Sequence, residues 1–268
     1  MLEKIDTQRT IAKDEYRKQM PPLQGRLFDL QRACWEAGIG VVVVFEGWGL
    51  SGKGAIIKKL TERLEPRAFE IHAMFAPRTH ELPLPWLYRF WGRLPAYGRM
   101  VVFDHGWHQV VVDGYVQGAL SEADRIRRFE DINAFERALA DDRYVVIKFF
   151  LHITEEEQAR RIEELGADED TKWRIGDRDR QEQRSHSAHL VAFEEVLART
   201  ESEWAPWTIL AAHDQRWARV KLFETLIARL EGELVQRGAD PATVEAGVGA
   251  EAGAGAEAGA GGGGADAG

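Results

Sequence analysis

The 268-residue chain is short of three features that mark particular classes of protein. It has one cysteine, Cys34, which excludes a disulfide framework and any metal site built from several cysteines. No apolar run approaches the roughly 20 residues that a membrane-spanning helix needs. Lys and Arg number 35 against 44 Asp and Glu, so bulk charge argues against nonspecific binding of nucleic acid. We therefore expect a cytoplasmic protein that binds neither membrane nor nucleic acid, with Cys34 as a small buried residue.

The end of the chain lacks most residue types. From residue 246 to residue 268 it contains only Gly, Ala, Val, Glu and Asp, a composition that cannot form a core. About 235 residues remain before this segment, which suits one α/β domain. The expected divisions are an N-terminal extension over 1–22 that ends at Pro21-Pro22, a folded domain over 23–237, and a disordered tail over 238–268.

The most informative stretch begins with the pattern of a buried strand. Val41 to Phe45 is a β-branched and aromatic run typical of a parallel strand covered on both faces. It leads into a loop of the form Gly-x-x-x-x-Gly-Lys and then into a helix-forming run. In such a loop the backbone N–H groups turn towards a phosphate, and the lysine adds a full positive charge. The sequence therefore predicts a phosphate site made of Gly47, Ser51, Gly52, Lys53 and Gly54.

The loop differs from the common form at two positions. Gly54 stands where Ser or Thr usually ligates Mg²⁺, and Gly49 offers no acidic side chain. Any metal must therefore be held by a residue outside the loop. Asp104 is the candidate, because it ends the apolar run Met100–Phe103, and the carboxyl end of a parallel strand faces the same crevice as the loop. We predict that Asp104 binds Mg²⁺; the alternative is a solvent-facing Asp that starts a turn.

Helix and strand patterns alternate along the rest of the chain. Strands separated by helices form βαβ units, which predicts an α/β fold with a five-stranded parallel sheet covered on both faces. The expected helices span 23–37, 53–64, 121–140, 154–165 and 214–236, and the expected strands span 41–45, 69–75, 100–104, 144–151 and 207–212.

Residues 166–190 form a polar stretch that is rich in arginine. Phosphoryl transfer needs positive charge over the phosphate oxygens, and kinases often bring it on a mobile lid. Arg174, Arg178 and Arg180 are candidates for this role. The alternative is a solvated helix in which the arginines pair with Asp177 and Asp179.

Other polar residues give weaker signals. Lys58, on the helix after the loop, and Arg78, after the second strand, could bind a long anionic ligand, although a single charge of this kind usually belongs to the solvated surface. His105 and His108 lie in a turn after Asp104. We interpret both as surface or packing residues, because no third metal ligand accompanies them.

The chain carries, in order, Phe45-Glu-Gly-Trp before Gly52-Lys-Gly54, Trp86-Leu-Tyr-Arg-Phe-Trp91, Val102-Phe-Asp104, Lys148-Phe-Phe-Leu-His152 and Asp170-x-x-Trp-Arg174. With these motifs, the stretch from residue 23 to residue 235 resembles the polyphosphate kinase 2 family. The resemblance implies an α/β phosphate-loop kinase-like three-layer domain with a helical lid over about 166–190 and an N-terminal helix. It also implies a homo-oligomer that uses Mg²⁺ to move phosphate between inorganic polyphosphate and an adenine or guanine nucleotide. Lys53 would bind the phosphates, Asp104 the metal, and Arg174 would lie on the lid.

The chain departs from the family pattern at three positions. Most members carry Asp where Gly49 stands, and Arg where His105 and Val110 stand. Loss of one electrostatic contact in the transition state commonly costs roughly 10²–10³ in rate. Two functions therefore stay open: a polyphosphate–nucleotide phosphotransferase, and an inactive domain that binds polyphosphate or a nucleotide. A substitute acid near the loop, such as Glu46 or Asp113, would favour the enzyme. A kinase that uses ATP is less favoured, because the basic residues are spread over a long path.

Overall fold

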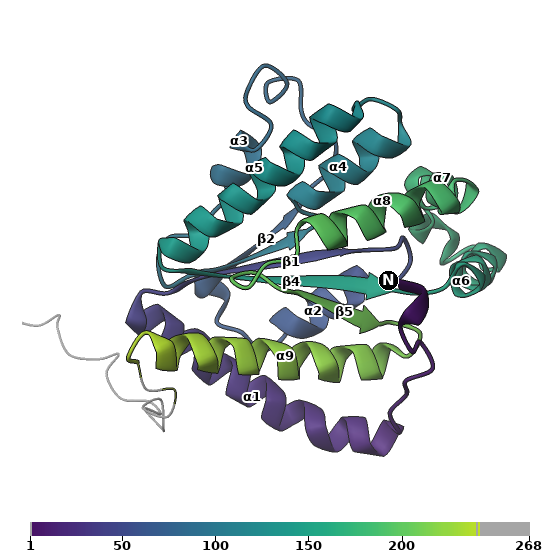
Figure 1. The fold of residues 1–268 in the computed structure, drawn as a ribbon. Coiled ribbons are helices and arrows are strands. Elements are labelled where there is room, and N and C mark those ends of the chain that lie inside the picture. The colour runs from purple at the N-terminus through teal and green to yellow at the C-terminus, as the bar shows by residue number, and fades with distance from the viewer. Residues whose placement is uncertain (1, 240, 242–268) are drawn as a thin grey trace, which may run out of the picture.

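The computed structural model describes residues 2–239 and 241, so most of the expected tail over 238–268 lies outside the described residues. The centre of the fold is a parallel sheet of five strands in the order β2-β3-β1-β4-β5 (Figure 1). The predicted α/β class and five-stranded sheet are confirmed. The strands are β1 (Gly40–Gly47), β2 (Phe69–Ala73), β3 (Met100–Asp104), β4 (Tyr144–His152) and β5 (Trp207–Ala211).

Helices cover both faces of the sheet. One face carries α1 (Lys13–Ala37), α2 (Lys53–Thr61) and α9 (Gln215–Gln236), and the other carries α4 (Trp107–Val116), α5 (Glu122–Asp141) and α8 (His186–Arg199) (Figure 1). Two more helices, α6 (Glu155–Ala167) and α7 (Asp177–Arg184), lie beyond the carboxyl end of β4. The short segments are α3 (Tyr88–Trp91) and the 3₁₀ turns η1 (Leu2–Lys4), η2 (Pro66–Ala68) and η3 (Lys172–Arg174).

The register of the central strands positions the site. Every residue of β1 is buried, as its run of valines predicts for a strand covered on both faces. Phe45 of β1 pairs with Asp104 of β3. The carboxyl end of β3 therefore lies level with the start of the phosphate loop, which follows β1 directly.

Three helices are capped at the N-terminus by a side chain that accepts hydrogen bonds from free backbone N–H groups of the first turn. Ser121 caps α5, Thr154 caps α6 and Asp214 caps α9, each by accepting from backbone N–H groups of the first turn. Such a cap contributes about 0.5–2 kcal/mol to helix stability. The caps of α6 and α9 also fix the ends of these helices that lie beside the phosphate loop.

The structure corrects three sequence-based expectations. Helix α1 begins at Lys13, ten residues earlier than expected, and contains Pro21 and Pro22. The prolines remove hydrogen bonds to the carbonyl oxygens of Arg17 and Lys18, but both of these residues are exposed, so water can replace the lost donors. Helix α4 begins at Trp107, within the turn expected over 105–108, and β2 ends at Ala73 instead of at residue 75.

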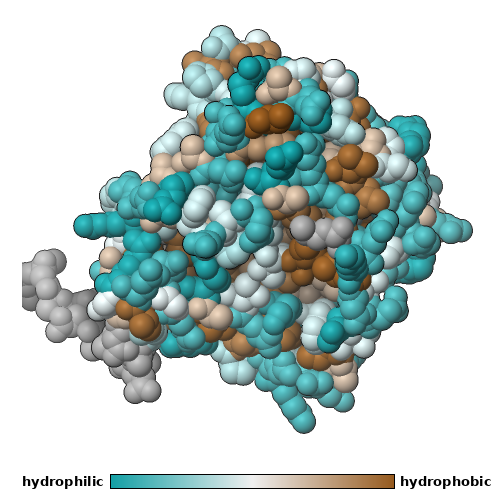
Figure 2. All heavy atoms as spheres, viewed as in Figure 1, coloured by the Kyte–Doolittle hydropathy of each residue, from teal (hydrophilic) through white to brown (hydrophobic). Residues whose placement is uncertain are grey.

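The surface and the lone thiol agree with the composition. Polar residues cover much of the face seen in Figure 2, with apolar patches scattered among them. Across residues 2–239, no helix combines the length and apolar character needed to cross a membrane. Cys34 is buried as predicted, and burial raises the pKa of its thiol to about 12.

Candidate active site

Two glycines of the phosphate loop have backbone conformations that L side chains rarely adopt. Gly47 has a φ of 128° and Gly52 a φ of 96°. At Gly47 a Cβ would also lie 2.3 Å from the carbonyl oxygen of Leu151 in β4. Because that oxygen belongs to a central strand, it cannot move aside. Both positions therefore need glycine, as the loop motif predicts.

Side chains of α6 and α9 hold the loop in shape by donating to its carbonyl oxygens. The loop conformation is therefore set by the protein itself, which is the preorganisation that favours binding of an anion. The pairs are Gln215 Nε2 with Ser51 O (2.7 Å), Arg161 Nη1 with Leu50 O (2.9 Å) and Gln158 Nε2 with Gly49 O (3.2 Å).

Lys53 begins α2 and is only 9% exposed. Its Nζ donates to two carbonyl oxygens of its own loop, at 2.7 and 3.0 Å. Burial lowers the pKa of Lys53, and the carboxylates of Glu182, Asp104 and Glu46 oppose this shift. The ammonium group is thus enclosed in a polar site that is largely closed to solvent.

Asp104 lies at the carboxyl end of β3, beside the loop. Its Oδ1 is buried without a hydrogen-bond partner, and the same holds for Oγ of Ser51. Within residues 2–239, no three metal-ligating side chains come together in one group. A lone carboxylate beside a phosphate loop nevertheless suits Mg²⁺, which often takes one or two carboxylates together with substrate phosphates.

The two substitute acids named from the sequence both have protein partners. Glu46 is 2% exposed, and its Oε1 accepts from the backbone N–H of Gly106 over 2.9 Å. Its Oε2 lies 3.1 Å from Nδ1 of His105, and burial raises the pKa of this carboxyl group. Asp113 accepts from Nη2 of Arg178 over 2.9 Å. Glu46 shapes the wall of the site, and Asp113 tethers the lid.

The two histidines after Asp104 have different surroundings. His108 is a packing residue, as the sequence indicates: it is 1% exposed and its Nε2 lies 3.0 Å from Oε1 of Glu136. His105 instead faces the site with a φ of 62°. Burial and the charges of Lys53 and Arg178 lower the pKa of His105 to about 3, so its imidazole is neutral.

The residue that faces Gly49 comes from the lid. Oε1 of Glu182, in α7, accepts from the backbone N–H of Gly49 over 2.6 Å, and Nε2 of Gln158 donates to the same oxygen over 2.7 Å. Glu182 is only 4% exposed. An acid therefore reaches the loop at the position where the loop itself has none.

Trp48 is a second link between loop and lid. Its indole ring is 1% exposed and stacks on the imidazole of His186, with centroids 4.2 Å apart and an angle of 6° between the planes. His186 is the first residue of α8, directly after the lid helix α7. The lid region thus contacts the loop at Trp48 as well as at Gly49.

The lid arginines named from the sequence lie in different places, and Arg180 is exposed on α7. Arg178 reaches across to α4, where it pairs with Asp113 and lines a pocket beside the loop. Arg174 is exposed in η3, with its guanidinium 5.7 Å from the ring centroid of Trp173. Because Arg178 pairs with Asp113 of α4, the alternative in which the arginines pair within α7 is wrong for Arg178. Asp179 instead accepts from the backbone N–H of Gly176 at the start of the helix.

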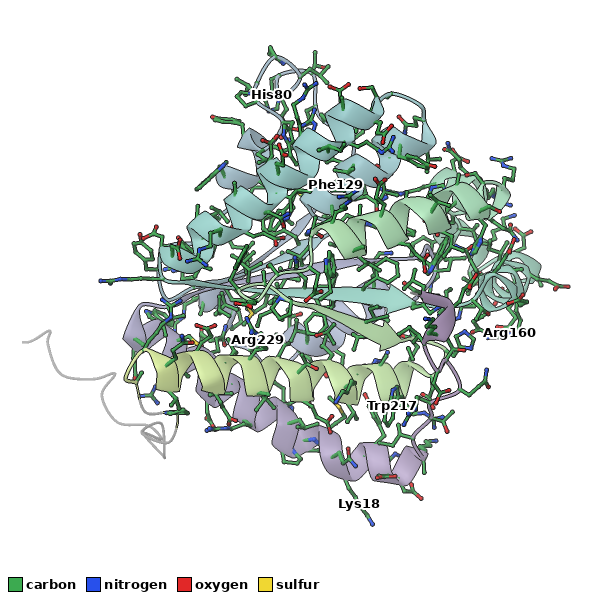
Figure 3. The ribbon with its side chains drawn as sticks, in the orientation of Figure 1. Lys18, His80, Phe129, Arg160, Trp217 and Arg229 are labelled. Atoms are coloured by element: carbon green, nitrogen blue, oxygen red, sulfur yellow. The ribbon has the colours of Figure 1, made fainter. Side chains whose placement is uncertain are left out.

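The remaining predicted phosphate ligands are exposed. Gly54 lies in the first turn of α2, and Lys58 lies one turn later on the same helix. Arg78 belongs to the loop between β2 and α3; Figure 3 places its neighbour His80 near the top of the molecule, far from Arg160 of α6. The structure therefore gathers Gly47, Ser51, Gly52, Lys53 and Asp104, adds Arg178 at the rim, and leaves Lys58, Arg78 and Arg174 on the surface.

Two adjoining pockets lie between the lid, α4 and the start of the β2–α3 loop. Their volumes are about 270 and 370 Å³, and Phe75, Asp113 and Arg178 line both. Arg89 and Arg128 add positive charge to the first pocket. These pockets open beside the carboxyl end of β3, where ligands of parallel α/β sheets typically bind.

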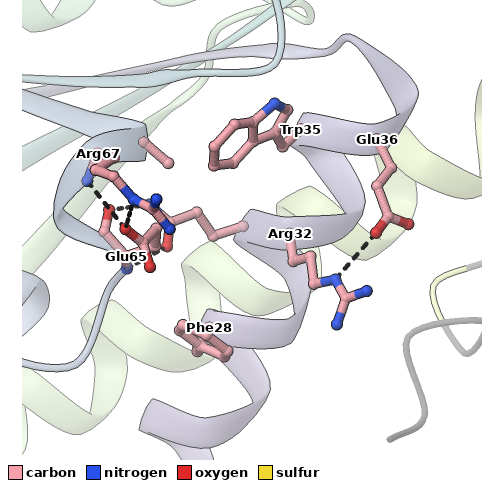
Figure 4. A pocket seen from close by; sticks show the side chains of 8 residues that line it. Phe28, Arg32, Trp35, Glu36, Glu65 and Arg67 are labelled. Carbon is pink, nitrogen blue, oxygen red and sulfur yellow. Dashed lines mark hydrogen bonds and ion pairs between the residues drawn. The ribbon is translucent and has the colours of Figure 1, made fainter. Parts of the chain in front are cut away.

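A separate hollow of about 310 Å³ lies between α1 and η2 (Figure 4). Phe28 and Trp35 supply its apolar walls. Its charged residues pair with each other, Arg32 with Glu36 and Arg67 with Glu65. This hollow is at the amino end of the sheet, so it does not belong to the phosphate site.

Comparison with known proteins identifies the family. Residues 10–238 match the family Polyphosphate kinase 2 (PPK2). The chain belongs to the polyphosphate kinase 2 family. It is 34% identical over 231 residues to a polyphosphate:AMP phosphotransferase of Pseudomonas syringae, which covers 86% of this chain and 46% of the relative. It is 32% identical to ADP-polyphosphate phosphotransferase 3 of Rhizobium meliloti, over 82% of this chain and 78% of the relative.

The fold agrees with this family assignment. A crystal structure assigned to polyphosphate kinase 2 from Pseudomonas aeruginosa matches with a TM-score of 0.84 and 32% identity, over 88% of this chain and 50% of that one. The chain thus spans about half the length of that Pseudomonas aeruginosa protein and of the Pseudomonas polyphosphate:AMP phosphotransferases that it matches. The phosphate-loop kinase-like architecture expected from the resemblance is confirmed.

Sequence reasoning missed several residues of this polyphosphate kinase 2 site. Nothing in the sequence indicated a role for Glu182, because an acidic residue in a highly charged stretch has the pattern of an ordinary surface residue. The residues that hold the loop from behind were also missed, since glutamine and arginine in helices carry no motif and only the fold brings them to the loop. These residues are Gln158, Arg161 and Gln215.

Proposed function

We propose that the protein is a phosphotransferase that moves phosphate between inorganic polyphosphate and an adenine or guanine nucleoside mono- or diphosphate. The observation that carries this proposal is the meeting of Lys53 and Asp104 in one crevice, with Arg178 at its rim. The family membership and the printed activities of the relatives support the same reaction.

In the proposed reaction an oxygen of the acceptor phosphate attacks the terminal phosphorus of the donor, and the bond to the bridging oxygen breaks. Catalysis of this kind rests on positioning and on stabilisation of charge. Lys53 and the loop N–H groups would hold the donor phosphates. Arg178 would release Asp113 and stabilise the charge on the transferring group.

Mg²⁺ is the proposed cofactor, and when bound it would neutralise charge on the phosphate oxygens. Oδ1 of Asp104 would hold it, since this oxygen is buried and without a partner. Ser51 has a second partnerless oxygen nearby in the loop, whereas Gly54 supplies none.

The pocket beside the lid is the proposed site of the acceptor. Phe75 and Phe90 give it apolar walls that suit a nucleoside. Nη1 of Arg128 is buried without a partner, so it is placed to bind an anionic group. The guanidinium of Arg89 adds a second positive charge to the same wall.

The alternative function, an inactive domain that binds polyphosphate or a nucleotide, has less support. The enzyme needs an acid beside the loop in addition to Asp104, and Glu182 meets that requirement from the lid. The homo-oligomer and the cytoplasmic location expected from the sequence stay predictions.

The proposal is tested by assaying the purified protein with Mg²⁺ and long-chain polyphosphate, with AMP, ADP and GDP offered separately. We expect phosphorylation of at least one nucleotide. Lys53→Ala should remove it, while Lys18→Ala, an exposed change on α1, should not (Figure 3). No turnover above the Lys53→Ala blank would reject the enzyme, and retained binding of polyphosphate would then favour the inactive alternative.

A further inference from the structure

Two side chains that also contact each other hold the backbone of Gly49, one at its N–H group and the other at its carbonyl oxygen. Oε1 of Glu182 accepts from its N–H over 2.6 Å, and Nε2 of Gln158 donates to its carbonyl oxygen over 3.2 Å. Gln158 also donates to that Glu182 oxygen over 2.7 Å. Glu182 and Gln158 are 4% and 1% exposed, so the arrangement is an interior one. Because α6 fixes Gln158, the position of Glu182 is specified by the fold and not by a mobile surface side chain.

The space beside Gly49 is filled by lid carboxylates. A Cβ at this position would lie 2.3 Å from Oδ1 of Asp179 and 3.3 Å from Oε1 of Glu182. The φ of Gly49 lies outside the left-handed region, so the backbone alone does not demand glycine. The lid carboxylates occupy the volume that a side chain would take, so a side chain at residue 49 would displace Asp179, Glu182 or both.

Glu182 also has an electrostatic partner at the centre of the site. Of the charges that act on buried Lys53, Glu182 exerts the largest favourable effect, ahead of Asp104 and Glu46. A buried ammonium group without a matching anion is costly. The lid therefore brings both a hydrogen-bond acceptor and a counter-charge to the loop.

We propose that Glu182 is the acidic residue of the phosphate loop, supplied by the lid, and that it completes the site only when α7 lies against Gly49. It is a positioning residue: it fixes the Gly49 peptide and balances Lys53 while phosphate is transferred. Gly49 and Glu182 act together: residue 49 of the loop has no side chain, and the acid of the lid lies in the space that a side chain would take. The catalytic part of this inference rests on the proposed function.

A competing view is that Glu182 merely blocks the loop until phosphate displaces it. The two views differ in kinetics. A positioning residue acts mainly on kcat, whereas a blocking carboxylate raises the KM for polyphosphate and leaves kcat unchanged. Glu182→Gln separates them, because the amide oxygen can still accept from Gly49 while the charge is removed.

The test uses Glu182→Gln and Gly49→Ala, with Glu169→Gln and Gly25→Ala as matched controls. Glu169 is an exposed acid near the start of the lid, and a Cβ at Gly25 would meet nothing within 4 Å. Unfolding midpoints establish that each variant is folded. Steady-state kinetics give kcat and the KM for polyphosphate, and hydrogen exchange of a peptide covering 47–53 reports the loop directly.

Both test variants should exchange faster at 47–53 than the wild type and the controls. In Gly49→Ala the new side chain displaces the lid acid, and in Glu182→Gln a neutral amide oxygen accepts a weaker hydrogen bond than a carboxylate. Glu182→Gln should lower kcat by at least about tenfold with a KM within about threefold of the wild type. Unchanged kcat with a lower KM would overturn the inference in favour of a blocking role, and unchanged kinetics with unchanged exchange would reduce the contact to packing. If the wild type shows no turnover, the proposed function fails, and the exchange data alone decide whether the lid acid holds the loop.

Discussion

The imidazole of His152 accepts a hydrogen bond from the indole N–H of Trp48, with 3.1 Å between Nδ1 and Nε1. His152 ends β4 and Trp48 follows β1, so the bond ties the phosphate loop to the neighbouring strand. A protonated imidazole has no acceptor nitrogen. The anchor of the loop therefore depends on His152 staying neutral.

Acid should weaken this anchor. Burial, with the nearby His213 and His186, lowers the pKa of His152 to about 4 from its ordinary 6.5. As the pH falls, the unfolded chain binds the proton first, so the contribution of neutral His152 is complete above pH 6.5 and is lost between 6.5 and about 4. Over that window the loss should be about 1–3 kcal/mol.

Urea unfolding between pH 4.5 and 7.5 checks this dependence. His152→Phe removes both the acceptor and the titration, so its stability should fall less steeply with acid than that of the wild type. His80→Gln, on an exposed loop, should follow the wild type. Parallel curves for the wild type and His152→Phe would show that this histidine does not carry the effect.

A buried ion pair lies on the other side of the sheet from the loop helix. Nζ of Lys148 donates to Oε2 of Glu136 over 2.7 Å and to the carbonyl oxygen of Thr200 over 2.6 Å, and both charged residues are fully buried. Removing one partner of such a pair commonly costs about 3–5 kcal/mol, because the other charge is left uncompensated. We expect a loss of this size for Lys148→Met in urea unfolding.

The double variant Lys148→Met/Glu136→Leu gives the matched comparison. Replacing a buried pair by apolar residues is often nearly neutral. Glu136→Leu also removes the acceptor of Trp107 Nε1 and the neighbour of His108 Nε2, so the double variant should recover only part of the loss. The exposed pair of Arg32 and Glu36 is the control, and Arg32→Ala should change stability by less than about 1 kcal/mol. A double variant as unstable as the single one would mean that the ion pair itself adds little, and that the bond of Lys148 to Thr200 and the contacts of Glu136 with Trp107 and His108 carry the stability.

The lid arginines should differ in their effect on catalysis. Arg178 lines the pocket beside the loop and is held by Asp113, whereas Arg180 on the same helix lines neither of the two pockets there. Arg178→Ala should lower kcat/KM for the nucleotide by about 10²-fold, the size typical of one lost electrostatic contact. Arg180→Ala should stay within about threefold of the wild type. Equal effects would indicate a general charge effect of the lid.

Much of the fold could be predicted because each signal was local. The valine run of β1, the glycine pattern of the loop and the capping residues act within a few positions of the sequence. The start of helix α1 was predicted wrongly, because packing against α9 outweighs the local cost of placing Pro21 and Pro22 inside a helix. Glu182 could not be predicted, since its role depends on Gly49, 133 residues away in the chain, and only the folded lid brings the two together.

Gly47 gives the most restrictive prediction for the loop. Its φ of 128° and the 2.3 Å approach of a Cβ to the carbonyl oxygen of Leu151 mean that even alanine must move the loop away from β4. That carbonyl oxygen also accepts from the N–H of Trp48 over 3.2 Å, so the displacement would break the first bond of the loop. Gly47→Ala should therefore lose binding of tripolyphosphate, measured by calorimetry, while keeping a cooperative unfolding transition. Gly232→Ala, where a Cβ meets nothing within 4 Å, should bind as the wild type does. Wild-type affinity in Gly47→Ala would mean that phosphate is held elsewhere, and the loop would lose its assigned role.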